Sequence, residues 1–368
     1  MSRNSESPPC VAVSGLHLGE NAQPGPGVIR SLREGIPGVR IVGLAYDALD
    51  SSLFMPGLLD DAFLMPYPSV TPETCLERLL EIRDETGINV LIPCLDVELP
   101  VLLRLETRLR EAGIALALPA AAALARRSKP RLMDLAADTG VATPATRTLL
   151  AVQDLEAAAR AYGWPLVVKG PFYEAEVVRG PVEAAAAFHK LSAKWGLPLL
   201  AQQFVAGEEF DVIALGDGLG GVHGPVGMRK TLVTRLGKAW AAVTVADEEL
   251  METARRVVSA LRWRGGCEVE MLRSSTDGRL YLIEFNPRFP AWVYLATAAG
   301  CNLPLGLVCL AQNRALPPYP APRAGVCFVR HAVEAIGDLS DMESLMTLGR
   351  MRPRPAAAEE EAHGPARV

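Results

Sequence analysis

Short apolar runs alternate with amphipathic stretches through the first third of the chain. The apolar runs predict strands at residues 11–15, 40–45, 90–93 and 115–118, and apolar residues at helical spacing predict helices at 28–34, 72–86 and 99–112. Strands that alternate with helices at this spacing indicate an open parallel sheet, because a crossover must carry the chain back between parallel strands. The loops at the carboxyl ends of those strands would face a ligand crevice.

The pattern changes after an Ala-rich stretch at residues 120–127, which predicts a connecting helix. A second helix is predicted at 129–138 and ends before Gly140. Further helices are expected at 153–162, 182–195 and 248–261, and strands at 165–169, 198–204, 210–215, 267–272, 280–286 and 326–331. This part of the chain is an α+β region. From residue 352 onward Pro, Ala and Glu leave little to bury, so the tail is predicted to be disordered.

The most informative local pattern is a pair of alternating stretches on either side of the turn signal Asp277-Gly278. Pairing about Asp277 places Glu270 opposite Glu284 and Glu268 opposite Asn286. Side chains alternate between the two faces of a strand, so these four share one face. The opposite face is expected to enter the core with Val269, Met271, Tyr281, Ile283 and Phe285.

Carboxylates that face each other across two strands destabilise the sheet unless a cation neutralises them. Magnesium suits this role, because it takes one or two carboxylates together with substrate phosphates. The alternative is a solvated polar face. The segment that follows favours the metal site, since Asn286 adds a neutral ligand and Arg288 a fixed cation that can stabilise a transferring phosphoryl group.

Glu270, followed fourteen residues later by Glu284-Phe285-Asn286-Pro287-Arg288, resembles the metal-binding signature of ATP-grasp enzymes. The most similar variants are those of the carbamoyl phosphate synthetase large subunit and biotin carboxylase. The resemblance covers roughly residues 10–312. It implies that Glu270 and Glu284 bind magnesium, with manganese as an alternative ion, that Asn286 assists, and that Arg288 acts on the intermediate.

The same resemblance assigns the nucleotide contacts. Lys129 and Lys169 stand in the order of two family lysines that contact ATP phosphates, although either one alone would be read as a solvated lysine. The segment from Gln203 onward resembles the family hinge. It implies adenine contacts at Gln203 and Val205 and a ribose contact at Glu209.

A basic stretch lies between the hinge and the acidic hairpin, with Arg229, Lys230, Arg235 and Lys238. These residues fit a solvated edge strand. In an ATP-grasp protein one or two of them would face the triphosphate or the acceptor carboxylate, and we favour Lys238 and Arg229. In the N-terminal region Asp96 and Glu98 are either substrate contacts or caps of the following helix.

Two stretches depart from the family pattern. Residues 170–176 contain almost no glycine where the family has a Gly-rich phosphate loop, so Tyr173 or Glu174 is a candidate substrate contact. The apolar residues 289–292 replace polar residues beside the acceptor. This argues against bicarbonate and for an acceptor with apolar surface, unless Trp292 belongs to the core.

Composition narrows the class of protein. The 368 residues suffice for two or three domains, and a net charge of −5 gives no general reason to bind nucleic acid or an anionic membrane. No run of eighteen apolar residues predicts a membrane span, and the start lacks a signal-peptide core. Seven scattered cysteines argue against a zinc site or disulfides, so a cytoplasmic protein is expected.

The prediction is therefore an α/β and α+β protein with an N-terminal parallel-sheet (pre-ATP-grasp) domain and a two-part ATP-grasp domain. Its boundaries are expected at residues 9–125, 126–203 for the small subdomain, 204–350 for the large subdomain, and 351–368 for the tail.

The predicted function is an ATP- and magnesium-dependent carboxylate–amine ligase that works through an acyl phosphate. Its substrates would be small molecules, such as an amino acid or peptide, and a homodimer is compatible with what relatives do. The alternatives are a catalytically silent nucleotide-binding regulator and, ranked lower, a bicarbonate-using carboxylase. A dehydrogenase ranks last, because the segment Gly25-Pro26-Gly27 does not continue as a dinucleotide fingerprint.

Overall fold

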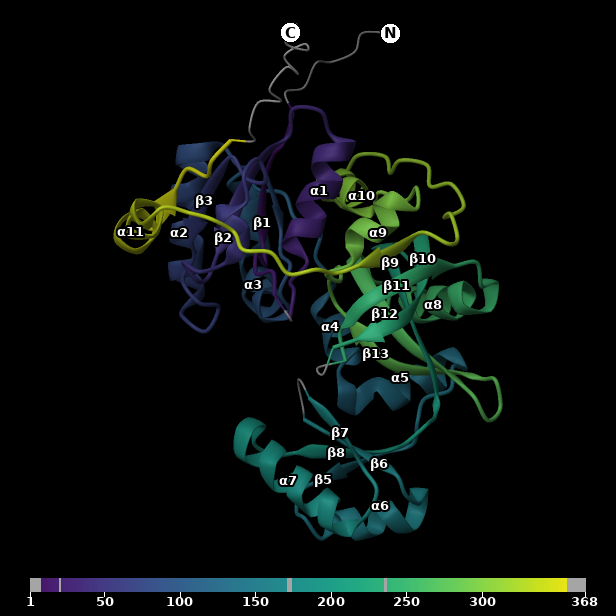
Figure 1. Ribbon diagram of the computed structural model, residues 1–368. Helices are drawn as coiled ribbons and strands as arrows, with labels where there is room; N and C mark the ends of the chain where they lie inside the picture. Colours follow the sequence, from purple (N-terminus) through teal and green to yellow (C-terminus); the bar gives the residue numbers. More distant parts are fainter. Residues whose placement is uncertain (1–7, 20, 171–173, 235–236, 356–368) are drawn as a thin grey trace, which may run out of the picture. The chain divides into compact units, whose positions relative to one another are not determined.

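The computed structural model describes residues 8–19, 21–170, 174–234 and 237–355, and the chain divides into two compact units (Figure 1). The first unit contains Met1–Leu118, Arg288–Tyr319 and the residues from Arg330 onward, and the second contains Pro119–Pro287 and Pro320–Val329. Most of the predicted disordered tail, residues 356–368, lies outside the described residues. Within those residues no helix combines the length and apolar character that crossing a membrane requires.

The first unit is built on the predicted parallel sheet. Strands β1 (Cys10–Ser14), β2 (Arg40–Ala45), β3 (Asp61–Leu64) and β4 (Val90–Ile92) run parallel, and β15 (Arg350–Met351) joins antiparallel in the order β15-β3-β2-β1-β4. Strand β1 is buried along its whole length, as expected of a central parallel strand covered on both faces. The strand predicted at 115–118 is reduced to one bridge between Val90 and Ala115.

The helices of the first unit come from both ends of the chain. They are α1 (Gly25–Gly35), α2 (Pro72–Thr86), α3 (Leu99–Glu111), α9 (Val293–Ala298), α10 (Leu303–Ala311) and α11 (Leu339–Leu348). Helix α1 packs against α9 and α10 (Figure 1). A Cβ atom at Gly25 would lie 2.4 Å from the carbonyl oxygen of Ser14, so the glycine-rich segment lets α1 start directly against the end of β1.

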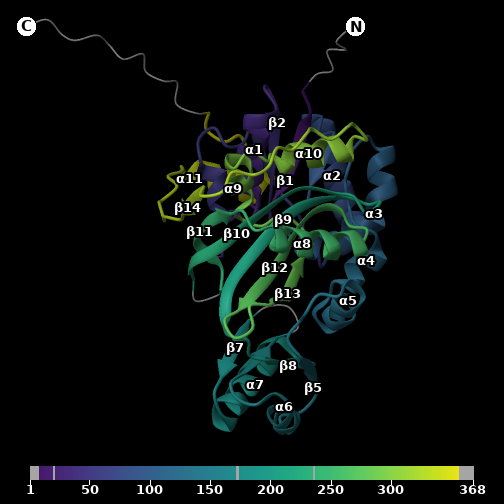
Figure 2. The same ribbon diagram turned by 90° about the vertical axis from the view of Figure 1, so that its right-hand side faces the viewer.

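The second unit begins with α4 (Ala121–Arg126), a 3-10 turn (Lys129–Arg131) and α5 (Leu132–Thr139), which ends at Gly140 in the left-handed conformation. A four-stranded antiparallel sheet follows, in the order β5 (Thr146–Leu149), β8 (Leu199–Gln203), β6 (Leu166–Lys169) and β7 (Ala175–Val178). Helices α6 (Asp154–Tyr162) and α7 (Pro181–Trp195) pack against this sheet around a small apolar core (Figures 1 and 2).

The largest element of the second unit is a six-stranded sheet. Its order is β13 (Leu280–Asn286), β12 (Arg264–Ser274), β9 (Gly207–Asp217), β10 (Val222–Val233), β11 (Ala239–Val245) and β14 (Cys327–Val329). Helices α5 and α8 (Glu248–Ala260) cover one face through a core that contains Trp263 in edge contact with Phe285. The Asp247 carboxylate accepts the Leu250 N–H at 3.0 Å and starts α8. The other face of the sheet is therefore left for polar groups.

The predicted pairing of the acidic hairpin is confirmed, with Glu268 opposite Asn286 and Glu270 opposite Glu284. Gly278 takes the positive φ of 72° that the turn needs. The core face predicted for β13 is wrong in part. Beyond Glu284 the register shifts at a β-bulge that sets Met271 opposite Leu282, so Leu280 and Leu282 enter the core instead of Tyr281 and Ile283.

Candidate active site

Three carboxylates form a row across neighbouring strands on the polar face of the large sheet. Glu284 of β13 lies opposite Glu270 of β12, and Glu270 lies opposite Asp211 of β9. Asp211 is only 3% exposed, because it stands in the middle of the sheet. Strand alternation adds Glu209 to the same face of β9, two residues before Asp211. The structure thus gathers acidic side chains where these strands run side by side (Figure 2), and burial raises the pKa of the most enclosed one, Asp211, well above its ordinary value.

Lys230 of β10 reaches into this row. Its ammonium nitrogen lies 3.1 Å from a Glu209 oxygen and 3.3 Å from oxygens of both Asp211 and Glu270. The side chain is 6% exposed. Burial alone would lower the pKa of Lys230, but these carboxylates outweigh it and raise the pKa well above its ordinary value. Lys230 is therefore a permanent cation.

Asn286 holds two carboxylates at the other side of the row. Its amide nitrogen donates to Glu268 at 2.9 Å and to Glu270 at 2.7 Å. Burial would raise the pKa of Glu270, but Lys230, Lys238 and the Asn286 hydrogen bond lower it to about 2. Glu270 is therefore ionised throughout the physiological range, as an oxygen ligand of a metal must be.

Both predicted phosphate lysines lie near the row. The Lys129 ammonium, in the 3-10 turn before α5, is 3.6 Å from Glu284 Oε1. Lys169 ends β6, where burial lowers the pKa of its ammonium against the opposing influence of Glu284, with further effects of Lys129, Glu270 and Glu209. Lys129 before α5, Lys169 at the end of β6 and two carboxylates of the large sheet thus belong to one cluster.

The predicted adenine residues lie where β8 passes into β9. The Gln203 N–H donates to the Ala145 carbonyl at 2.8 Å, and Gln203 pairs with Leu166 of β6. Val205 follows in the connection and is half-buried. Glu209, the predicted ribose contact, is about half exposed and shares Lys230 with the acidic row. The hinge residues are therefore continuous with the charged cluster through β9.

The three residues predicted to act on the transferring group are not gathered together. Arg229 points to the opposite face from Lys230 and pairs with Glu208 at 3.0 Å. Lys238 acts electrostatically on Glu270. Arg288 belongs to the first unit, where its Nε lies 3.0 Å from Asp96. Of the remaining basic residues predicted there, Arg235 lies outside the described residues.

The two departures from the family pattern have structural explanations. The Glu174 carboxylate accepts from Lys194 and from Trp195 Nε1 of α7, so its side chain is engaged within the unit formed by the four-stranded sheet and its helices. Tyr173 lies outside the described residues. Phe289 and Trp292 are 3% and 6% exposed, which makes them core residues of the first unit. The apolar segment therefore carries no information about the acceptor.

Lys230 and Asp211 were not among the predicted site residues. One signal was available, because Asp211 lies in the strand predicted at 210–215 and an extension of that strand by one residue would put Glu209 on the same face. The choice between Arg229 and Lys230 depended on the register of β10 against β9, which no local pattern gives. The prediction that Glu98 caps the following helix is wrong, because its side chain makes no cap hydrogen bond to α3. Glu98 instead accepts the N–H groups of Cys94 and Leu95 and the hydroxyls of Ser14 and Tyr46.

The oxygen atoms of the candidate metal ligands suit a hard cation whose remaining ligands are not protein atoms. Within the described part of the chain, no three His, Cys, Asp or Glu side chains converge as a ready metal-binding group. Glu270, Glu284 and Asn286 supply two carboxylates and an amide. This set fits magnesium, whose remaining ligands are water and phosphate oxygens.

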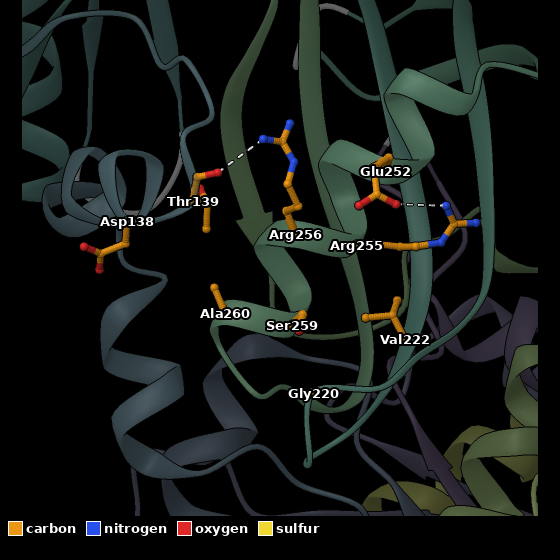
Figure 3. A pocket seen from close by; sticks show the side chains of 9 residues that line it. All are labelled: Asp138, Thr139, Gly220, Val222, Glu252, Arg255, Arg256, Ser259 and Ala260. Atoms are coloured by element: carbon orange, nitrogen blue, oxygen red, sulfur yellow. Dashed lines mark hydrogen bonds and ion pairs between the residues drawn. The ribbon is translucent and has the colours of Figure 1, made fainter.

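A separate hollow of about 500 Å³ lies on the other side of the sheet, between α5 and α8 (Figure 3). Its arginines are already engaged, since Arg255 pairs with Glu252 and Glu248 and Arg256 donates to the Thr139 carbonyl. It shares no residue with the acidic row. We therefore place the nucleotide chemistry at the row and not in this hollow.

Comparison with known proteins identifies the domain that carries the row. Residues 166–291 match the model of the ATP-grasp domain family. A D-alanine–D-alanine ligase of Chromohalobacter salexigens is 27% identical over 171 residues, which make up 43% of this chain and 54% of that enzyme. The chain thus spans about half the length of this curated relative.

Solved structures extend the likeness to the fold of most of the chain. The biotin carboxylase domain of a Hydrogenobacter thermophilus 2-oxoglutarate carboxylase, a dimer crystallised with MgADP, ADP and bicarbonate, superimposes with a TM-score of 0.65 at 17% identity, covering 87% of this chain and 73% of that one. An L-amino acid ligase of Bacillus licheniformis gives 0.62 at 18% identity, covering 84% and 76%. The chain therefore contains an ATP-grasp domain and has the fold of the ATP-grasp superfamily.

Proposed function

We propose that the protein is an ATP- and magnesium-dependent ligase that joins a small carboxylic acid to an amine. The observation that carries the proposal is the approach of Lys129 to Glu284, beside Glu270 and Asn286, inside an ATP-grasp domain. Two carboxylates and an amide can hold a metal, and two lysines can hold the phosphates that the metal bridges. The arrangement therefore fits activation of an acid by ATP.

In this reaction a carboxylate oxygen attacks the γ-phosphorus of ATP, and ADP leaves. The amine then attacks the acyl carbon, phosphate leaves, and the amine gives up a proton as the amide forms. Lys129 and Lys169 would hold the triphosphate, Gln203 and Val205 would bind adenine, and Glu209 would bind the ribose. A magnesium ion held by Glu270 and Glu284 would neutralise charge on the phosphates.

Arg288 is the residue for the acid or the acyl phosphate. Asp96 holds its Nε at 3.0 Å, and its amino group donates to the Phe289 carbonyl at 3.1 Å. A guanidinium fixed in this way keeps its positive charge and its orientation, and both suit a planar anion. Lys238 would add positive charge next to Glu270, whereas Arg229 would act only at the periphery because it lies on the other face of the sheet.

The substrate class that the likenesses favour is an amino acid or a short peptide. Both the D-alanine–D-alanine ligase and the L-amino acid ligase are, by name, enzymes that ligate amino acids. Screening amino acids singly and in pairs with ATP and magnesium by thermal shift would identify the acid. Shifts that depend on ATP would support this substrate class, and a response to bicarbonate alone would favour a carboxylase.

Replacing Glu284 by Gln tests the proposed function. Gln keeps the size of the side chain but removes the charge that a metal needs, so ADP release in the presence of acid and amine should fall by roughly 100-fold or more. Glu156→Gln is the matched control, because Glu156 is an exposed residue of α6 paired with Arg160. Equal ADP release by the Glu284→Gln variant and the wild type would rule out this metal site.

A catalytically silent nucleotide-binding protein is the second candidate. The scarcity of glycine in residues 170–176 favours it, because backbone amides approach phosphates less freely without glycine. ATP binding without ADP formation across the whole panel of acids and amines would support this candidate and contradict the ligase.

A further inference from the structure

Lys230 is the most buried cation of the acidic row, and its contacts are unusual for a lysine. Three carboxylates, from Glu209, Asp211 and Glu270, lie within 3.3 Å of its nitrogen, and they come from two different strands. A β-bulge follows immediately, since Lys230 pairs with Ala242 of β11 while Leu232 pairs with Ala241. Bulges next to a functional site re-aim side chains, and this one accompanies the inward position of Lys230.

Burying a lysine is costly unless it is paired on all sides, so its position needs an explanation. A purely structural sheet could place an apolar residue here, as Met228 is placed opposite Asp211 two positions earlier. The neighbouring carboxylates, which the nucleotide site requires, explain why a lysine is placed here. Those carboxylates would repel one another in the protein before any ligand arrives.

The contacts of Glu270 show what the lysine does to this site. One carboxylate oxygen of Glu270 lies 3.3 Å from Lys230, and the other accepts the Asn286 amide at 2.7 Å. An Asp211 oxygen lies 3.3 Å from the same nitrogen, and Asp211 and Glu270 stand opposite each other on neighbouring strands. The ammonium therefore contacts two neighbouring carboxyl groups at once, as a divalent ion that bridged them would.

We propose that Lys230 is a resident cation of the nucleotide site, which takes the place of a divalent ion between Asp211 and Glu270 and holds Glu209 and Glu270 in position before ATP binds. The inference rests on the proposed nucleotide function of the same row. Lys230 acts through Glu270 and Glu209 and is a positioning residue. It follows that the nucleotide-free protein binds divalent ions weakly and that the metal arrives together with ATP on the Glu284 side of Glu270.

Replacing Lys230 by Met or by Gln tests this inference through metal binding in the absence of nucleotide. Removing the positive charge should create a cation position, so each variant should bind one additional Mn²⁺ roughly tenfold or more tightly than the wild type, as measured by the electron paramagnetic resonance signal of free Mn²⁺. Lys230→Arg keeps the charge and should behave like the wild type. Unchanged Mn²⁺ affinity and stoichiometry in Lys230→Gln would overturn the proposal.

The proposal can still be tested if the Lys230→Met or Lys230→Gln variant fails to fold without metal. If either neutral variant unfolds without metal, recovery of its thermal transition on addition of Mn²⁺ supports the resident cation, and failure of both variants to recover overturns it. Lys190→Met is the matched control, since Lys190 makes an exposed ion pair with Glu176 and its loss should leave Mn²⁺ binding unchanged. A change of the same size in this control would also contradict the proposal.

The two proposals fail in different experiments. If the wild-type protein does not bind ATP in the presence of magnesium, the ligase proposal is wrong, whereas the Mn²⁺ comparison between wild type and Lys230→Gln needs no nucleotide. In the ligase, Lys230→Gln should also raise KM for ATP more than it lowers kcat, because the residue prepares the binding site. Rescue by Lys230→Arg in both measurements separates this role from a loss of packing.

Discussion

At the scale of single residues, the chemistry of the row depends on which groups keep their charge. Lys169 has a lowered pKa because it is buried, and Glu284 opposes this effect. Lys230 has a raised pKa although it is buried, because carboxylates surround it on three sides. Two lysines of one cluster are thus shifted in opposite directions, and Lys169 is the one whose charge responds to alkaline pH.

Lys169 should make ATP binding sensitive to alkaline pH. Only the protonated ammonium attracts phosphate, so the favourable contact is complete below the lowered pKa of Lys169 and is lost as the pH rises through it. ATP affinity of the wild type should therefore decline at a lower pH than an ordinary lysine would predict. Titrating ATP binding between about pH 7 and 10.5, the ordinary lysine pKa, measures this decline.

Lys169→Arg is the control for that titration. Arginine stays charged throughout the range, so the variant should lose the alkaline decline even if its affinity at neutral pH is lower. An identical pH profile for the variant and the wild type would show that Lys169 does not contact phosphate.

At the scale of secondary-structure elements, the bulge in the acidic hairpin decides which side chains of β13 are structural. Leu282 is fully buried in the core of the large sheet, whereas Ile283 is half-buried outside it. Strict alternation of side chains from Phe285 predicted that Ile283 would be in the core and Leu282 outside it. The extra residue resets the alternation between Phe285 and Leu282, so that Glu284 and Asn286 can face the site while the outer part of the strand still packs.

Alanine substitutions at Leu282 and Ile283 should show which of the two side chains is in the core. Leu282→Ala should lower the free energy of unfolding by about 2–5 kcal/mol because it leaves a cavity, and Ile283→Ala should cost roughly 1–2 kcal/mol less. Chemical denaturation followed by tryptophan fluorescence gives both values. A larger loss at Ile283 than at Leu282 would contradict the bulged register.

At the scale of the whole molecule, each unit has its own polar centre. In the first unit Glu98 joins the carboxyl ends of three parallel strands, because its acceptors bind Ser14 at the end of β1, Tyr46 after β2, and the Cys94 and Leu95 N–H groups after β4. Burial raises the pKa of Glu98 against these four hydrogen bonds. In the second unit, the polar centre is the row of acidic side chains around Lys230.

Glu98→Gln should therefore weaken the first unit and leave nucleotide binding in the second unit intact. Gln replaces one acceptor oxygen by a donor, which leaves buried N–H and O–H groups without a partner and should cost about 1–3 kcal/mol of unfolding free energy. Denaturant unfolding measures the loss, and Glu77→Gln on the exposed side of α2 is the control. A loss of ATP affinity equal to that of Glu284→Gln would contradict a purely structural role.

Local information in the sequence was enough for much of the fold. The bounds of β2, α2 and β13 were predicted correctly, because apolar periodicity and end signals such as Thr71 before α2 and Gly87 after it act within a few residues. The pairing of Glu270 with Glu284 and of Glu268 with Asn286 also followed from one turn signal, whereas the bulge between these pairs and the turn did not. Strands β3, β11 and β15 were missed, and the two-residue strand β15 depends on pairing with β3, which is distant in the sequence.

The sequence by itself determined that Glu270 lies opposite Glu284 and that Glu284 and Asn286 share one face of a hairpin, because the turn signal and the alternation of side chains act within a few residues. It also placed these residues in an ATP-grasp pattern. Tertiary structure alone decided that Lys230 and not Arg229 enters the row, that Asp211 completes it, that Arg288 is held by Asp96, and that Trp292 is a core residue. Each of these depends on contacts between segments far apart in the chain, which the alternation of a single strand does not specify.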